Sequence, residues 1–415
     1  MERSIRWMGL GGIIRATGVS LVLPFLVLYL RRVLDLGYTE IGVLVALTGV
    51  VPLLIVPFAG LLTDRIGRRR LFLLSLAGEA GSFLALAGAM RLESLVGVLV
   101  LATTVQIVGT IGGPALSAYV ADFTEGSDRT MGFTWLRIGW NVGFTIGVLA
   151  GGVLIGFVGF VWVAFGAGVV LLGSTSLLAA VLDPSPYDRR RAAAASVGAR
   201  VEPTAAPSAS VRRSLEILAR DRPFLALCAV VALSELTIGQ WATIFPLYVN
   251  TVLGLPYALL GAGFALNGLI VVFGQAPMTR AAAGRRHTSL FVGGVAAYAV
   301  GFFLFGVVGQ YSLFLVPMFF AVVFVLTIGE NLTSIPMSTL PSNLAPPTEI
   351  GAYNGAFFAL IGIGQLLAPA VGGAVVATGA APLAVWSALV APSVPAGLIL
   401  ALYVTPRLRD APNRA

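Results

Sequence analysis

Long apolar segments recur along the whole chain of 415 residues and are separated by short polar loops. A helix that crosses a bilayer needs roughly 20 mostly apolar residues. Backbone groups inside lipid must be satisfied within their own segment, which favours helices. We therefore predict an all-α integral membrane protein with twelve transmembrane helices, at 5–31, 39–62, 70–90, 94–121, 130–156, 159–182, 223–250, 257–279, 287–308, 312–340, 350–378 and 382–405.

The composition agrees with a chain whose surface faces lipid. Hydrophobic residues make up 58% of the sequence and charged residues 11%, whereas a soluble domain carries about 25% charged residues. The 50 glycines suit helices that approach one another closely in lipid, where small residues line the contacts. We expect the protein to work in the lipid bilayer as a monomer.

The basic residues indicate the orientation of the chain. All 26 are arginines, and the net charge is +8. A basic chain can bind nucleic acid, but these arginines lie in short loops between apolar segments, which is a pattern of membrane topology. Most of them fall on one side of the predicted helices, whereas Arg31, Arg32 and Arg91 fall on the other. We predict a multi-pass protein of the cell membrane with both termini cytoplasmic, and no nucleic-acid partner.

A polar insert divides the apolar segments into two sets of six. It covers 183–222 and is rich in alanine, proline, serine and arginine. This composition predicts a flexible cytoplasmic linker, with a short amphipathic segment at 211–220. Residues 1–182 and 223–415 are then predicted to form two six-helix bundles, the second with a short cytoplasmic tail.

The two predicted bundles repeat each other. The glycine-rich segments that begin at Gly143 and Gly364 match at an offset of 221 residues, and the first helix of each bundle carries a late proline, Pro24 or Pro246. Such repeats are typical of secondary transporters, which bind substrate at the interface of the repeats.

The loop between the second and third predicted helices carries a specific motif. It reads Gly60-Leu-Leu-Thr-Asp64-Arg65-Ile-Gly67-Arg68-Arg69-Arg70. A bias of arginines toward the cytoplasm accounts for the basic residues, but not for Asp64 and the two glycines at fixed spacing. The motif resembles the signature loop of the major facilitator superfamily, Gly-x-x-x-Asp-Arg-x-Gly-Arg-basic. The helix number, the linker and the repeat extend this resemblance over nearly the whole chain.

The resemblance implies the major facilitator fold, with two pseudo-symmetric six-helix bundles. It also implies that the loop is a conformational latch, which holds the halves in the outward-facing state. The latch residues are then Gly60, Asp64, Arg65, Gly67 and Arg68. We predict that Arg68 pairs with a carboxylate at the cytoplasmic end of the fourth helix, for which Asp122 is the candidate.

Glycines recur every four residues along the fifth predicted helix, at Gly139, Gly143, Gly147 and Gly151. Residues at this spacing share one helix face, and a face of glycines permits another helix to approach closely. Together with Gly152 the pattern resembles the antiporter signature of drug-efflux members, Gly-x-x-x-Gly-Pro-x-x-Gly-Gly. Val148 stands where that signature has proline, although Pro369 is present in the second copy. The glycines therefore suit a packing role as well as a mechanistic one.

Ionisable residues lie inside several predicted spans, where each costs at least a few kcal/mol unless it faces a cavity or a partner. Arg15, Glu235 and Glu330 fall on the first, seventh and tenth helices, which line the central cavity in the fold that the chain resembles. Glu235 or Glu330 is our candidate for the carrier of a coupling proton, and Arg15 is expected to favour release of that proton. A structural ion pair between Arg15 and one of these acids is the alternative.

Two further groups of polar residues lie in the spans. Polar and aromatic side chains accompany the candidate acids and predict a mixed pocket for a small-molecule substrate, although each alone is commonly a packing residue: Gln240, Trp241, Asn267 and Asn331. Glu79 and Arg137 lie about two turns from the cytoplasmic side, and we predict that they form a buried gating pair.

The chain lacks the residues that other energy sources and catalysis require. It has no lysine, so it has no phosphate loop of the Gly-x-x-x-x-Gly-Lys type. One histidine, His287, and one cysteine, Cys228, allow neither a metal cluster nor a catalytic triad. We expect no cofactor, no metal and no enzyme activity.

These inferences favour a secondary transporter that moves a small molecule by alternating access. The resemblance to the twelve-helix drug:proton antiporter branch points to proton-coupled efflux of amphipathic compounds. A proton-coupled uptake symporter for a metabolite is one alternative, and a non-transporting membrane sensor on the same fold is another. The buried carboxylates argue against the sensor, which has no evident need of them.

Overall fold

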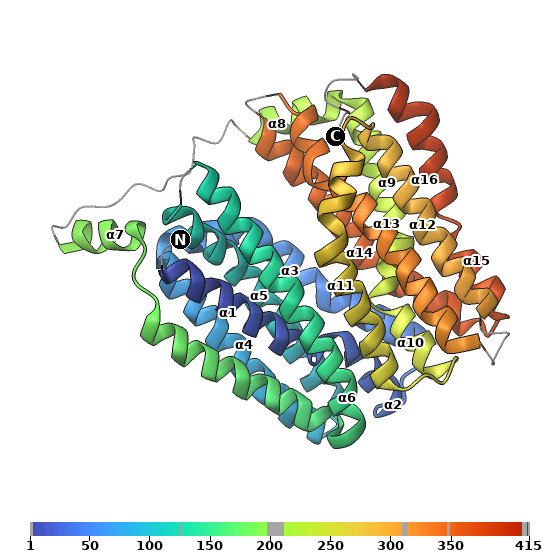
Figure 1. Cartoon of the computed structure of the whole chain (residues 1–415), viewed down its shortest axis with the longest axis horizontal. Helices are drawn as coiled ribbons and strands as arrows, with labels where there is room; N and C mark the ends of the chain where they lie inside the picture. Colours follow the sequence, from blue (N-terminus) through green and yellow to red (C-terminus); the bar gives the residue numbers. More distant parts are fainter. Residues whose placement is uncertain are drawn as a thin grey trace. The chain divides into compact units, whose positions relative to one another are not determined.

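The computed structural model describes residues 3–124, 126–196, 211–308, 314–346, 349–408 and 413. All regular secondary structure within these residues is helical (Figure 1). The α-helices are α1 Arg3–Ser20, α2 Leu26–Arg32, α3 Tyr38–Ile66, α4 Arg68–Arg91, α5 Leu95–Asp122, α6 Gly126–Val181, α7 Pro186–Ser196, α8 Val211–Arg220, α9 Arg222–Ile238, α10 Ile244–Thr251, α11 Tyr257–Ala282, α12 His287–Val308, α13 Leu315–Leu344, α14 Ile350–Ala377, α15 Pro382–Val390 and α16 Ser393–Ile399. Short turns of other helix types lie at η1 Leu23–Phe25, η2 Gly239–Trp241, η4 Leu400–Val404 and η5 Thr405–Arg407.

Eleven helical stretches of the described chain are long and apolar enough to cross a membrane. One of them, Trp135–Val181, covers both of the predicted spans 130–156 and 159–182. It does so because α6 is interrupted only at Gly159, whose φ of 81° and ψ of 169° are not helical. The positive φ explains why glycine stands at this bend.

Two of the predicted spans are broken near their ends. The first consists of α1, the turn η1 and α2, and Pro24 is the second residue of η1. The seventh consists of α9, the turn η2 and α10, and Pro246 lies in the first turn of α10. Proline has no N–H to donate along a helix and is tolerated in a first turn, so the paired prolines of the repeat mark paired breaks.

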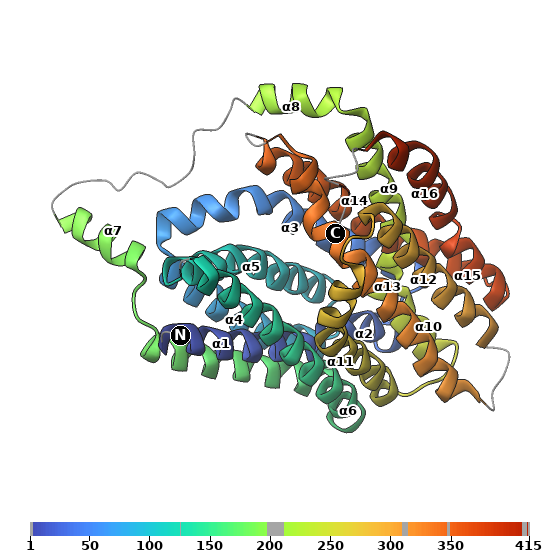
Figure 2. The same ribbon diagram turned by 45° about the horizontal axis from the view of Figure 1, so that its top comes forward.

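The chain divides into two compact units. Unit 1 consists of Met1–Leu34, Leu47–Ala206 and Pro256–Gly268, and unit 2 consists of the remaining segments Asp35–Ala46, Pro207–Leu255 and Leu269–Ala415. Within unit 1, α1 and α4 both pack on α6, and α4 also packs on α5 (Figures 1 and 2). Within unit 2, α9 packs on α14, and α12 packs on α13 and α15. Helices α3 and α11 each contribute their first part to one unit and their remainder to the other.

The glycines of α6 form a continuous contact with the backbone of α1. A Cβ atom at Gly139 would lie 3.2 Å from the carbonyl oxygen of Gly9, and one at Gly151 would lie 2.5 Å from that of Leu21. Between them, two more glycines lie against carbonyl oxygens of α1 in the same register: Gly143 against Ile13 and Gly147 against Thr17. The predicted shared glycine face is confirmed, and it packs on α1 at main-chain distance.

A second close crossing occurs once in each unit. In unit 1, a Cβ atom at Gly152 would lie 3.1 Å from Cα of Gly261 in α11. In unit 2, a Cβ atom at Gly373 would lie 3.2 Å from Cα of Gly42 in α3. The two glycine-rich segments that repeat in the sequence therefore also make equivalent glycine–glycine contacts in the structure.

The segment that we predicted to be a flexible linker contains two helices among its described residues. The amphipathic segment 211–220 is the helix α8, whose Leu218 is buried in an apolar cluster with Phe224 of α9. The preceding part contains α7, which the sequence did not predict. Residues 197–210 lie outside the described residues.

Candidate functional site

Helices α3 and α4 are joined by a single residue, Gly67. Its φ of 100° is the conformation that glycine adopts without strain. A Cβ atom there would also lie 2.7 Å from Oδ1 of Asp188, so the site has no room for a side chain. The second glycine of the predicted motif is therefore required by the backbone of this junction.

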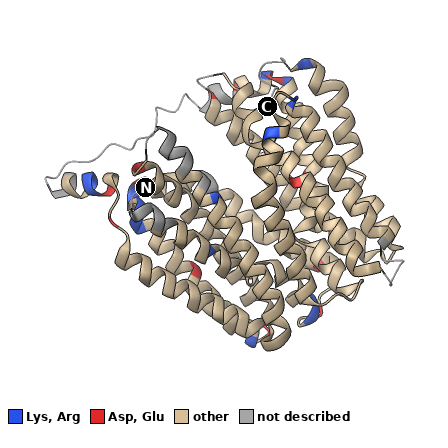
Figure 3. Ribbon diagram, in the orientation of Figure 1, with Lys and Arg blue, Asp and Glu red and all other residues tan. Residues whose placement is uncertain are grey.

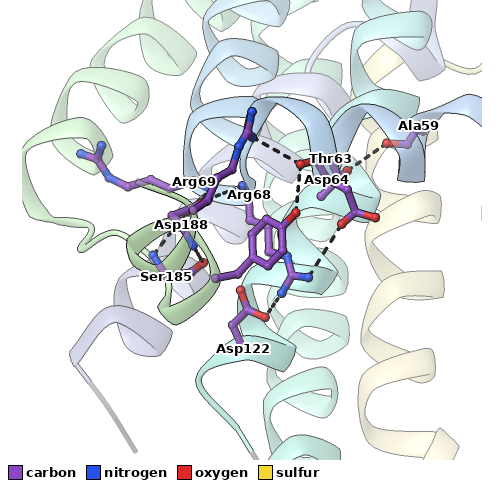
Figure 4. Close-up of polar contacts among 10 residues, drawn as sticks. Ala59, Thr63, Asp64, Arg68, Arg69, Asp122, Ser185 and Asp188 are labelled. Carbon is purple, nitrogen blue, oxygen red and sulfur yellow. Dashed lines mark hydrogen bonds and ion pairs between the residues drawn. The ribbon is translucent and has the colours of Figure 1, made fainter. Parts of the chain in front are cut away.

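Arg68, the first residue of α4, forms an ion pair with Asp122 at the end of α5 (Figure 4). This confirms the predicted pair. Nη2 of Arg68 also lies 3.8 Å from Oδ1 of Asp64 in the last turn of α3. The side chains of Arg68 and Asp122 are each only 12% exposed, so water screens their attraction less than that of a surface pair.

The pair of Arg68 and Asp122 retains unused hydrogen-bonding atoms. Nε of Arg68 and Oδ2 of Asp122 are buried and have no hydrogen-bond partner among the described residues. Buried polar atoms of this kind are uncommon in folded proteins. The ion pair therefore leaves one buried donor and one buried acceptor without a hydrogen bond to a described residue.

The segment that follows α6 is attached to the α3–α4 junction by several hydrogen bonds (Figure 4). Oδ1 and Oδ2 of Asp188 accept from the backbone N–H groups of Arg68 and Arg69, at 2.9 and 3.1 Å. Tyr187 donates its hydroxyl hydrogen to the carbonyl oxygen of Asp64 at 3.0 Å. Its ring also lies under the guanidinium of Arg68, with Cζ 4.2 Å from the ring centroid.

Other residues of the motif contribute less to this cluster. Arg69 donates to the carbonyl oxygens of Leu182 and Ala179 at the end of α6 and just beyond it. Arg65 is exposed. Gly60 has open space where its Cβ would be.

Most other charged residues of the described chain lie near helix ends (Figure 3). Glu79, in the middle of α4, is an exception. It is 1% exposed and pairs with Arg15 of α1, which is 12% exposed. We predicted Arg137 as the partner of Glu79, but the bidentate partner is Arg15. Arg15 was predicted to act on Glu235 or Glu330; both acids lie in unit 2, and Arg15 is instead paired within unit 1.

A glycine of a third helix makes the pair of Arg15 and Glu79 possible. A Cβ atom at Gly109 of α5 would lie 2.8 Å both from Nη2 of Arg15 and from Oε1 of Glu79. The guanidinium also lies 5.6 Å from the ring centroid of Trp140 in α6. Four helices of unit 1 thus enclose this pair.

In unit 2, Glu235 lies near the end of α9 and is 2% exposed. Gln365 of α14 hydrogen-bonds to its carboxyl group. The other oxygen, Oε2, is buried without a hydrogen-bond partner among the described residues. A Cβ atom at Gly364 would lie 2.6 Å from Cβ of Glu235, so α14 packs directly on this position.

The other predicted cavity residues differ in their surroundings. Glu330 of α13 is half-buried, whereas the adjacent Asn331 is fully buried, with neither Oδ1 nor Nδ2 bonded to a described residue. Gln240 donates to the carbonyl oxygen of Ala368 at 3.0 Å, which links η2 to α14. Trp241 stacks on Phe245, with ring centroids 4.4 Å apart.

Asn267 does not belong to the same compact unit as the other cavity residues. It is buried, and it lies in the first part of α11, which is part of unit 1. Glu235, Gln240, Trp241, Glu330 and Asn331 all lie in unit 2. The predicted pocket residues are therefore divided between the two units.

The sequence reading missed Tyr187 and Asp188. Both fall in the segment that composition marked as a linker. A local signal was present, because Ser185 and Asp188 have the spacing of a helix capping box.

Comparisons with known proteins agree with this architecture. The family model of the Major Facilitator Superfamily matches residues 8–369. The class C tetracycline resistance protein of Escherichia coli is 29% identical over 296 residues, which cover 70% of each chain. The uncharacterized MFS-type transporter YttB of Bacillus subtilis is 26% identical over 395 residues, which cover 91% of this chain and 89% of that one.

Solved structures share the fold at low sequence identity. A POT family transporter in complex with 5-aminolevulinic acid has a TM-score of 0.77 over 99% of this chain and 97% of that chain, at 13% identity. The nucleoside transporter NupG, crystallised as a single-residue mutant, has a TM-score of 0.73 over 98% of this chain, at 14% identity. The match of the family model over most of the chain shows that the protein is a multi-pass membrane transporter of a small molecule and that its chain belongs to the major facilitator superfamily.

Proposed function

We propose that the protein exports small amphipathic compounds in exchange for protons, as a monomer of the cell membrane with both termini cytoplasmic. Tetracycline resistance proteins of three further classes are 32 or 33% identical over 140 to 156 residues. These matches cover about a third of this chain, 33 to 37%. They support efflux as the direction of transport and a polycyclic, amphipathic compound as the kind of substrate.

The burial of Glu235 is the observation that supports the proposal of proton coupling. Its carboxyl group is almost fully buried and has one oxygen without a partner among the described residues. A carboxylate in such surroundings is costly to keep ionised, which suits a group that takes up and releases a proton during a transport cycle. A hydrogen bond with Gln365 of α14 holds this carboxyl group of α9 in place.

Glu330 and Asn331 supply the second candidate position. Asn331 is buried with both amide atoms free of described partners, and an unmet buried amide costs free energy that a substrate hydrogen bond offsets. We propose that Asn331 contacts substrate and that Glu330 either carries the proton or recognises a cationic group. We do not include Arg15 in this proposal, because its guanidinium forms an ion pair with Glu79.

The test uses purified protein in lipid vesicles with an imposed pH gradient and with tetracycline or ethidium as probe. Glu235→Gln should abolish gradient-driven flux but preserve exchange of labelled probe for unlabelled probe. Glu93→Gln, in an exposed loop, is the matched control and should behave like the parent. Full gradient-driven flux in both Glu235→Gln and Glu330→Gln would exclude these acids as carriers. Movement of probe together with protons would make the protein an uptake symporter.

A further inference from the structure

The first turn of α4 receives its cap from a distant segment of the chain. The first N–H groups of an α-helix have no acceptor within the helix. Gly67 precedes α4 and has no side chain to supply one. The two oxygens of Asp188 accept from Arg68 and Arg69 instead.

The same segment also contacts the end of α3. The carbonyl oxygen of Asp64 accepts from Tyr187 at 3.0 Å and from Nη1 of Arg191 at 3.3 Å. Carbonyl groups in the last turn of a helix lack donor partners within the helix in the same way. Residues 185–191 therefore satisfy both sides of the junction around Gly67.

Asp188 is itself held in place at the start of α7. Its backbone N–H donates to Oγ of Ser185 at 3.1 Å, and its Oδ2 accepts from the backbone N–H of Ser185 at 3.3 Å. These reciprocal bonds are those of a capping box. One carboxylate thus caps α7 and α4 together.

We propose that Asp188 is a positioning residue of the latch: it fixes the first turn of α4 and thereby directs Arg68 onto Asp122. Arg68 is the first residue of that turn, so fraying of the turn displaces its side chain. Tyr187 also restricts the same side chain, by contact of its ring with the guanidinium. The inference rests on the proposed transport function and on the expectation, from the family resemblance, that Arg68 and Asp122 belong to a conformational latch.

Hydrogen exchange of the purified full chain measures the cap without any substrate. In Asp188→Ala, the amides of Arg68 and Arg69 should exchange about fivefold faster, which is the typical effect of losing an N-cap. Asp188→Asn should restore most of the protection, because the amide oxygen still accepts a hydrogen bond. Arg190→Ala changes an exposed side chain of the same helix and should match the parent.

A double-mutant cycle of melting temperatures shows whether Asp188 acts through Arg68. Asp188→Ala should lower the melting temperature less than half as much in an Arg68→Ala background as in the parent. Equal losses in both backgrounds would overturn the proposal. So would an Asp188→Asn variant that behaves like Asp188→Ala, because the effect would then come from charge and not from capping. Neither measurement depends on transport, so a failed flux assay would be distinguishable from failure of this inference.

Discussion

Glu79 accepts two parallel hydrogen bonds from Arg15, with Nε to Oε2 at 2.7 Å and Nη2 to Oε1 at 2.5 Å. Bidentate pairs of this geometry are among the stronger polar contacts in proteins. Because both side chains are shielded from water, loss of one leaves the other as a buried charge without compensation.

Glu79→Gln should therefore destabilise the protein by about 3–5 kcal/mol. Thermal melting in detergent measures this loss. The double variant Arg15→Met, Glu79→Met should be far more stable than the sum of the single losses, since it leaves no unpaired charge. A Glu79→Gln protein that melts like the parent would show that the pair contributes nothing to stability.

Gly143→Ala should destabilise unit 1 by about 1–3 kcal/mol, because its Cβ would overlap the backbone of α1. Gly156→Ala, on the same helix, is the control, since its Cβ would meet open space. Melting temperatures of the two variants provide the comparison. Equal stability of both variants would mean that α1 and α6 accommodate the added methyl group without loss of stability.

Asp64→Asn should lower the rate of probe efflux about tenfold while leaving the melting temperature within a few degrees of the parent. The reason is that its carboxylate lies near Arg68 but is partly exposed, so that it contributes charge to the latch rather than to the core. In a cycle of Arg68→Ala and Asp122→Asn, the losses of efflux should be non-additive. Normal efflux by Asp64→Asn would remove this loop from the transport cycle.

Cysteines introduced at Ala195 and Asp410 should resist an impermeant thiol reagent in intact cells, in a Cys228→Ser background. Both positions belong to arginine-rich segments that we place in the cytoplasm. Glu93→Cys, in an exposed loop on the opposite side, should react readily. Rapid labelling at 195 or 410 with none at 93 would reverse the orientation.

The sequence was informative where a pattern is local. Apolar length predicted the spans, four-residue spacing predicted the shared glycine face, and the charges of Arg68 and Asp122 predicted their contact. The partner of Glu79 was not predictable in this way, because the choice between Arg15 and Arg137 depends on which helices are neighbours and on the space left by Gly109.

The role of the segment after α6 was missed for a related reason. Its polar composition is that of a linker, and its function arises from contacts with residues more than a hundred positions earlier. The capping-box spacing of Ser185 and Asp188 indicates the start of a helix. It does not indicate that the same carboxylate reaches the first turn of α4.

The crossings of Gly152 with Gly261 and of Gly373 with Gly42 show how the two halves of the chain depend on each other. In each of them, a glycine from one half of the gene meets a glycine from the other half. Neither half of the chain therefore completes such a crossing by itself. Val148 and Pro369 stand one helical turn before Gly152 and Gly373, so the two crossings share their glycines but differ in the residue that precedes them.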